Sequence, residues 1–109
     1  MHISGAELRR SGQKHIIGKV VYHCRRVVEL HEMRMVLQRE TPAGWRKVVG
    51  DTDNTIPPPS GRAREGRVVF PDCITGTWRM WVRAKTVYQG KRYRSPKVYS
   101  APNYVDCEA

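Results

Sequence analysis

The residues of this chain that could support catalysis or bind a metal are four histidines, three cysteines and ten carboxylates. A hydrolytic triad needs a nucleophile, a base and a group that orients the base. None of the histidines lies in a recognisable catalytic motif, and each is best interpreted as a surface or strand-face residue. They are His2, His15, His23 and His31. The sequence therefore predicts a protein that is not an enzyme.

Metal-binding patterns are also incomplete. Asp51 and Asp53 in the stretch GDTDN resemble half of a calcium-binding loop, but the glycine and the later glutamate of such a loop are missing. Aspartates in this setting more often cap turns. Separated cysteines and scattered histidines do not supply the ligand spacing of a zinc site. We expect no metal and no cofactor.

The cysteines instead indicate a disulfide. Cys24 ends an early apolar strand and Cys73 precedes a tryptophan-rich strand, so a bridge between them would join two sheets. It would close a loop of about 50 residues, which the chain-entropy model values at about 4 kcal/mol. The alternative is two buried thiols in a reducing compartment. Cys107 is then left free or linked to another chain.

Strands must position these residues, because the dominant period of hydrophobicity is two. Residues 77–88, TWRMWVRAKTVY, show it most clearly, and residues 15–24, 32–39, 44–50, 67–70 and 91–100 follow the same alternation. In the first of these stretches, Trp78, Met80, Val82 and Ala84 alternate with Arg79, Trp81, Arg83 and Lys85. We expect the apolar set to face a core and the basic set to face water.

Turn-forming stretches separate the strands. TPAG at residues 41–44 and YQGK at residues 88–91 are typical hairpin loops, and residues 50–66 form a proline- and glycine-rich loop. Six or seven short antiparallel strands separated by turns predict an all-β, immunoglobulin-like β-sandwich, with a small β-barrel as the alternative. The chain of 109 residues suits one domain over residues 15–107, preceded by an extended arm over residues 1–14.

Several stretches occur in a suggestive order: GKVVYHC, MRMVLQRE, GWRKV and CITGTWRMWVRAKTVYQGKRYRSPKVYS. Over residues 15–107 this layout resembles a family of small cysteine-containing β-sandwich proteins of actinobacteria, usually secreted and mostly uncharacterised. Cys24, Cys73, Gly76, Thr77, Trp78, Arg79 and Cys107 occupy the positions of its motifs. The resemblance supports the Cys24–Cys73 bridge and implies no enzymatic activity. Members usually also carry a leader and a further cysteine near the mature N-terminus, and HISGAELRRSG contains neither.

No apolar stretch of a signal peptide occurs in residues 1–14, and no segment approaches the length of a membrane span. We expect a protein that stays where it is made or one whose leader was removed. A leaderless sandwich with an extended arm suits a virion component of an actinobacterial phage, such as a capsid decoration or tail protein. A secreted interaction module is the alternative, which leaves the virion or the extracellular space as the expected location.

The formal net charge is +10, from 20 basic and 10 acidic residues. This charge favours an acidic protein surface, a nucleic acid or anionic lipid as partner, or it serves only solubility. Trp81 among arginines is unexpected for solubility alone, since it could stack on a guanidinium, anchor a protein partner or stack on a base. We expect a protein-binding structural or adaptor subunit, with a basic nucleic-acid-binding protein as the alternative. Its expected contacts are Trp81, Arg79, Arg83 and Lys85, with Arg9 and Arg10 in the arm and the loop 56–61.

Overall fold

The computed structural model describes residues 2–9, 13–23, 30–53 and 63–108, and within these ranges strands are the only regular secondary structure. The strands are β1 (His2–Arg9), β2 (His15–His23), β3 (Leu30–Thr41), β4 (Gly44–Asp53), β5 (Ala63–Phe70), β6 (Gly76–Tyr88), β7 (Lys91–Arg94), β8 (Val98–Tyr99) and β9 (Asn103–Val105).

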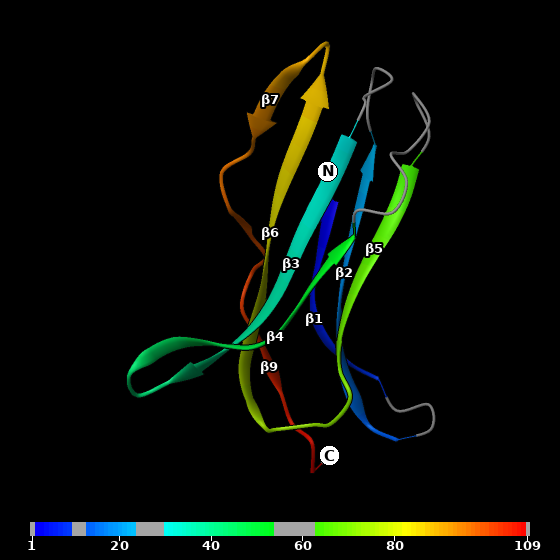
Figure 1. The fold of residues 1–109 in the computed structure, drawn as a ribbon. Helices are drawn as coiled ribbons and strands as arrows, with labels where there is room; N and C mark the ends of the chain where they lie inside the picture. Colours follow the sequence, from blue (N-terminus) through cyan, green and yellow to red (C-terminus); the bar gives the residue numbers. More distant parts are fainter. Residues whose placement is uncertain (1, 10–12, 24–29, 54–62, 109) are drawn as a thin grey trace.

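Two antiparallel sheets pack face to face (Figure 1). The small sheet has the order β1-β2-β5, and the large sheet has the order β4-β3-β6 with β7, β8 and β9 along the other side of β6. This is the strand arrangement of an immunoglobulin-like sandwich. The sheets do not close on each other, so the predicted all-β sandwich is confirmed and the barrel alternative is ruled out.

The last strand position is divided into three pieces. Among the described strands, β7, β8 and β9 each pair with β6 alone, and Pro96 and Pro102 lie between them. Proline has no N–H to donate to a ladder, so it is confined to sheet edges and interruptions. Together the three pieces form one broken edge strand. Counted in this way, the sandwich has seven strand positions, within the predicted six or seven.

The core is the space between the sheets, and the predicted alternation fills it. Trp78, Met80 and Val82 of β6 are fully buried. They belong to one buried hydrophobic cluster with Met33, Met35 and Leu37 of β3 and Ile16, Val20 and Tyr22 of β2. At Gly18 the sheets approach so closely that a Cβ would lie 2.8 Å from Sδ of Met80. The core therefore requires glycine at this point of β2, because packed interiors do not accommodate extra volume without strain.

A polar contact closes the open edge between β4 and β5. The hydroxyl of Tyr22 donates to Oδ2 of Asp53 at 2.9 Å, and Nε and Nη2 of Arg64 donate to the same carboxylate at 3.0 Å each. Asp53 belongs to the large sheet, whereas Tyr22 and Arg64 are register partners in the small sheet. The contact therefore ties the two sheets together.

Alkaline pH should weaken this tie. Burial, together with the hydrogen bond and the negative charge of Asp53, raises the pKa of Tyr22 from 10.0 to about 12. Because the folded pKa is the higher one, its stabilisation is complete below pH 10 and is lost as the pH rises through about 12. We expect Tyr22→Phe to lose less unfolding free energy than the wild type between these pH values. Urea unfolding followed by circular dichroism at several alkaline pH values measures the difference, and parallel curves would contradict the prediction.

Residues 2–9 are not a free arm, which corrects the organisation predicted for residues 1–14. β1 pairs with β2 along most of its length, and Nδ2 of Asn103 in β9 donates to the carbonyl of Ala6 at 2.8 Å. A register shift between Ser4 and Glu7 allows Ala6 to be buried as well as Ile3 and Leu8 to pack on the core. That shift interrupts the period of two, which is why the apolar face of β1 was not recognised.

The predicted loop over residues 50–66 is also shorter than expected. β4 continues to Asp53 and β5 begins at Ala63, which pairs with His23. Residues 54–62, and with them the contact proposed for residues 56–61, lie outside the described residues. Cys24 and Arg10 lie outside them too.

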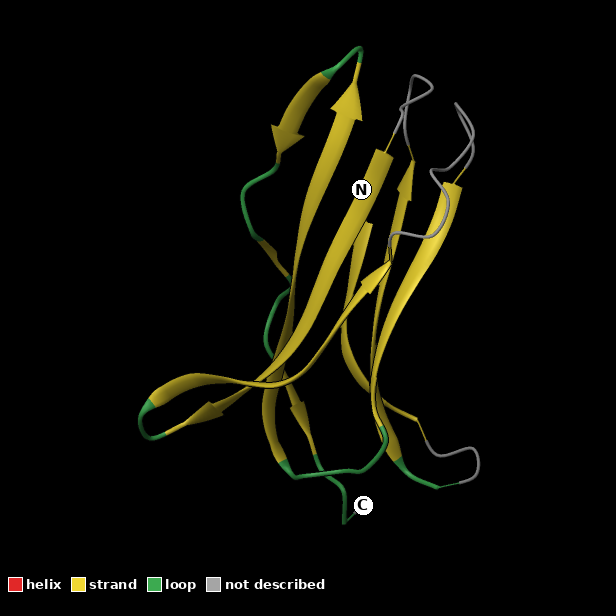
Figure 2. Cartoon of the chain, in the orientation of Figure 1, coloured by secondary structure: helices red, strands yellow, loops and turns green. Residues whose placement is uncertain are grey.

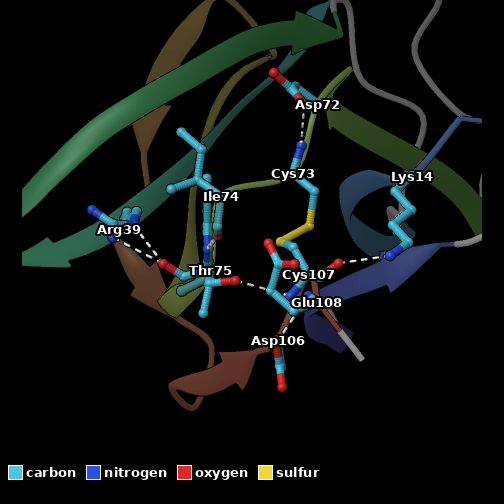
Figure 3. Close-up of a disulfide and its surroundings, with 10 residues drawn as sticks. Lys14, Arg39, Asp72, Cys73, Ile74, Thr75, Asp106, Cys107 and Glu108 are labelled. Atoms are coloured by element: carbon cyan, nitrogen blue, oxygen red, sulfur yellow. Dashed lines mark hydrogen bonds between the residues drawn. A yellow bond between two sulfur atoms is a disulfide. The ribbon is translucent and has the colours of Figure 1, made fainter.

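The disulfide joins Cys73 to Cys107, with the Cα atoms 5.9 Å apart (Figure 3). The predicted Cys24–Cys73 bridge is therefore wrong, because the sulfur of Cys73 is already bonded. The physical reason is register: Gly76 pairs with Val105, so the chain just before β6 and the chain just after β9 run side by side. The bridge thus links neighbouring segments of the large sheet instead of joining the two sheets.

Hydrogen bonds hold the C-terminal segment around this bridge (Figure 3). The backbone N–H of Cys107 donates to Oγ1 of Thr75 at 3.0 Å, and Nζ of Lys14 donates to the carbonyl of Cys107 at 2.6 Å. Nη2 of Arg39 donates to the carbonyl of Thr75 at 2.9 Å. The disulfide therefore fastens a segment that is hydrogen-bonded to Lys14, just before β2, and to Thr75, just before β6, and Thr75 is itself held by Arg39 of β3.

Candidate functional site

The outer face of the large sheet carries a dense set of basic and aromatic side chains. Cross-strand register assigns them to this face, because residues that pair directly point to the same side. We call this surface the basic face; its members are Arg34, Trp45, Lys47, Arg79, Trp81, Arg83, Lys85, Arg92, Arg94, Lys97 and Tyr99. The β3–β4 hairpin, which carries Trp45, extends away from the body of the sandwich (Figure 2).

Arg79 is fixed at the centre of this face. Its Cζ lies 4.3 Å from the ring centroid of Trp45 and 4.4 Å from that of Tyr99. Its Nε donates to Oε1 of Gln38 at 2.8 Å. Trp45 comes from the β3 side of β6 and Tyr99 from the β8 side, so the rings approach from two directions. A guanidinium held in this way can still donate from its remaining N–H groups.

Trp81 is half-buried, and cations cover it. Nζ of Lys97 lies 4.5 Å from its ring centroid, and Cζ of Arg83 lies 6.0 Å from it. Arg83 therefore contributes to the cover of Trp81, whereas Arg79 stacks on other rings. The aromatic faces of this surface are largely occupied by the protein's own cations.

An apolar layer lies beneath these side chains. Val36 is only 1% exposed although it lies on the outer face, opposite Gly50 on one side and Trp81 on the other. At Gly50 a Cβ would lie 2.9 Å from Nη2 of Arg34, so glycine lets this guanidinium lie against β4. Nη1 of Arg34 also donates to Oγ1 of Thr52 at 3.2 Å. The basic face is therefore a packed surface with defined side-chain positions.

A hollow of about 240 Å³ opens in this surface beside Trp81. We call it the groove; it is lined by Glu32, Arg34, Trp81, Arg83, Lys85 and Arg94. Most of its lining is cationic, and a single carboxylate is present.

The outer face of the small sheet differs in charge balance. Its cations have carboxylate partners: Lys19 and Arg67 both pair with Glu65, at 3.8 and 2.8 Å. The hydrogen bond from Arg67 lowers the pKa of Glu65, which keeps it ionised. On the basic face, by contrast, the described residues hold no salt bridge. Among the described residues, cations without a carboxylate partner are thus gathered on the basic face.

All four predicted contacts of the central strand, Trp81, Arg79, Arg83 and Lys85, lie on the basic face. Arg9 does not, because it lies on β1 of the small sheet, where it pairs with Glu7 at 3.0 Å. Trp45, Lys97, Arg34 and Arg94 were not predicted to join this site, and Tyr99 was a possible contributor whose face the sequence left open. A bulge between Leu37 and Gln38 brings Trp45 and Lys47 to the outer face while Val49 faces inward, which a uniform period of two in residues 44–50 would not give.

Among the described residues, no group of three or more His, Cys, Asp or Glu side chains is placed to hold a metal ion. The part of the chain that the structure describes also contains no helix long and apolar enough to cross a membrane. No protein-family model, curated protein or solved structure matches the chain. The resemblance to small actinobacterial sandwich proteins stays a prediction, and function must be argued from the basic face.

Proposed function

We propose that this protein is a non-enzymatic binding module, a structural or adaptor subunit that contacts an acidic surface of another protein through the basic face. The observation that carries the proposal is the separation of charge between the two outer faces. Within the described part of the chain, cations on the outer face of the small sheet are paired with carboxylates, whereas those of the basic face stack on aromatic rings or have no carboxylate partner. Complementary charge steers partners to such a surface and sets the orientation of binding.

A protein partner fits this face better than a nucleic acid. Single strands are bound by open aromatic platforms on which successive bases stack. Here Trp45 and Tyr99 face Arg79, and Trp81 faces Lys97, so those rings are already engaged. Arginine, tryptophan and tyrosine held in fixed positions are the residue types that most often dominate protein–protein binding energy.

The disulfide bears on the environment in which the protein works. Disulfides persist mainly in oxidising environments, so the Cys73–Cys107 bridge supports work outside the reducing cytoplasm. We propose a subunit of a larger assembly, with a virion component of an actinobacterial phage as one version and a secreted module as the other. A gene that encodes a signal peptide upstream of His2 would exclude the virion version.

Two charge-reversal variants test the basic face. Lys85→Glu with Arg94→Glu changes this face, and Arg9→Glu with Arg67→Glu changes the small sheet by the same net charge. At about 0.15 M salt, where the Debye length is about 8 Å, we expect the first variant to bind immobilised poly-L-glutamate at least about tenfold more weakly than the wild type. The second variant should bind within about threefold of the wild type. Biolayer interferometry measures both affinities. Equal losses of affinity in the two variants would show that binding depends on total charge and not on the basic face.

A nucleic acid is the second candidate partner, favoured only by the net charge of +10. A thymidine oligonucleotide in the same experiment distinguishes it from a protein partner. Nucleic-acid binding would be tighter than binding of poly-L-glutamate and would fall steeply between low and moderate salt. That outcome would replace the acidic protein surface with a nucleic acid as the partner.

A further inference from the structure

The groove beside Trp81 brings like charges unusually close together. Arg34 and Arg83 are direct cross-strand partners of β3 and β6, and Lys85 and Arg94 are direct partners of β6 and β7. Side chains in such pairs have Cβ atoms about 4.5–5.5 Å apart, and like charges in this position destabilise a sheet. Two adjacent basic pairs on one face thus create a site where an anion would relieve repulsion.

Arg83 is the least satisfied member of this set. Its side chain makes no hydrogen bond or salt bridge to the described residues, and its Nε is buried without an acceptor among them. An unpaired polar group away from water is costly, and more so when it is charged. The buried Nε is out of reach of a ligand, but Nη1 and Nη2 are not buried and have no hydrogen bond to the described residues. A guanidinium is a planar fork of donors that matches a carboxylate, so an acidic group can pair with these two terminal nitrogens.

We propose that the groove is a carboxylate-binding site that takes one aspartate or glutamate side chain of an extended acidic segment in a partner protein. This inference rests on the proposed function and names the chemistry at its centre. Arg83 provides the bidentate contact, while Lys85 and Arg94 supply charge from the adjoining pair. Trp81 also lines the groove, with Lys97 over its ring, so its indole resonance can report on binding there.

The size and composition of the groove select this ligand. A volume of about 240 Å³ lies below the roughly 300–1,000 Å³ of pockets for drug-sized molecules, so one side chain with its hydration is the better fit. Glu32 lines the same groove, is the register partner of Lys85, and forms no salt bridge with the described residues. Its carboxylate would repel a chain of phosphates, whereas a protein segment can place a basic or neutral residue beside it.

The site can be tested with acetyl-Ala-Glu-Ala-amide and its glutamine counterpart, followed by NMR of the full chain. We expect the glutamate peptide to shift the Trp81 indole and Arg83 guanidinium resonances saturably, and the glutamine peptide to leave them in place. Arg83→Lys keeps the charge but removes the planar fork of donors, so it should raise the dissociation constant of the glutamate peptide about fivefold or more. Glu32→Gln removes a negative charge that repels the carboxylate of the peptide, so it should lower the dissociation constant about two- to threefold.

Arg9→Lys on the small sheet is the matched control and should leave the dissociation constant unchanged. Equal binding by Arg83→Lys and the wild type would overturn the proposal, as would binding of the glutamine peptide at the same resonances. Tighter saturation of these resonances by inorganic phosphate would assign the groove to phosphate instead. Binding of poly-L-glutamate could still depend on the basic face while the glutamate peptide fails to shift the Trp81 and Arg83 resonances. In that case only the carboxylate site in the groove is wrong, and the proposed function stands. If the two charge-reversal variants bind poly-L-glutamate equally well, the proposed function itself is contradicted.

Discussion

Replacing Trp78 with alanine is expected to lower the free energy of unfolding by about 3–5 kcal/mol, whereas the same change at Trp81 should cost about 1 kcal/mol. The two residues are three positions apart in one strand, yet they face opposite sides of the sheet. The comparison therefore measures how much of the stability depends on the inward face of β6.

Trp78 carries the larger effect because it has no exposed surface and fills the core beside Phe70, with ring centroids 5.6 Å apart. Its Nε1 also donates to the carbonyl of Ile74 at 2.9 Å. Alanine would leave a cavity and an unpaired carbonyl, both of which destabilise a folded domain. At Trp81, which is half-buried on the outer face, alanine removes mainly the contacts to Lys97 and Arg83 and leaves the core between the sheets filled.

Urea unfolding followed by far-UV circular dichroism measures both variants without relying on tryptophan fluorescence. Trp78→Ala could leave too little stability for a measurable baseline, since small domains are stable by only about 5–15 kcal/mol. Trp78→Phe is then the informative variant, with an expected loss of about 1–3 kcal/mol. Comparable losses at Trp78 and Trp81 would contradict the inward orientation of Trp78.

Removal of the disulfide is the second large effect. Cys73→Ser combined with Cys107→Ser should lower the free energy of unfolding by about 3–4 kcal/mol, because the bridge spans a sequence separation of 34 residues. In the chain-entropy model, the loss arises from greater freedom of the unfolded chain. Loosening of the segment that donates from Cys107 to Thr75 adds to it.

Peptide mapping under non-reducing conditions gives the direct check on the pairing. We expect one linked peptide pair containing Cys73 and Cys107, with Cys24 available for alkylation after unfolding. A reductant should destabilise the wild type by nearly as much as the double substitution and should have little effect on the double variant. A linked pair containing Cys24 and Cys73 would contradict the pairing and restore an inter-sheet bridge.

The sequence by itself determined which side of β6 faces the core. Alternation of Trp78, Met80 and Val82 with Arg79, Trp81 and Arg83 is a local property of an extended chain, so it can be interpreted without knowing the partner strands. Turn stretches between such segments then determined the fold class. The same local pattern placed four of the predicted contact residues on one face.

The tertiary structure alone decided which strands, and which residues on them, lie side by side. The bulge between Leu37 and Gln38 set the face of Trp45, and the shift between Ser4 and Glu7 turned β1 toward the core. The pairing of β9 with β6 brought Cys107 to Cys73. Register between strands depends on hydrogen bonds formed across large sequence separations, and a slip of one residue reverses every side chain, so no local pattern specifies it.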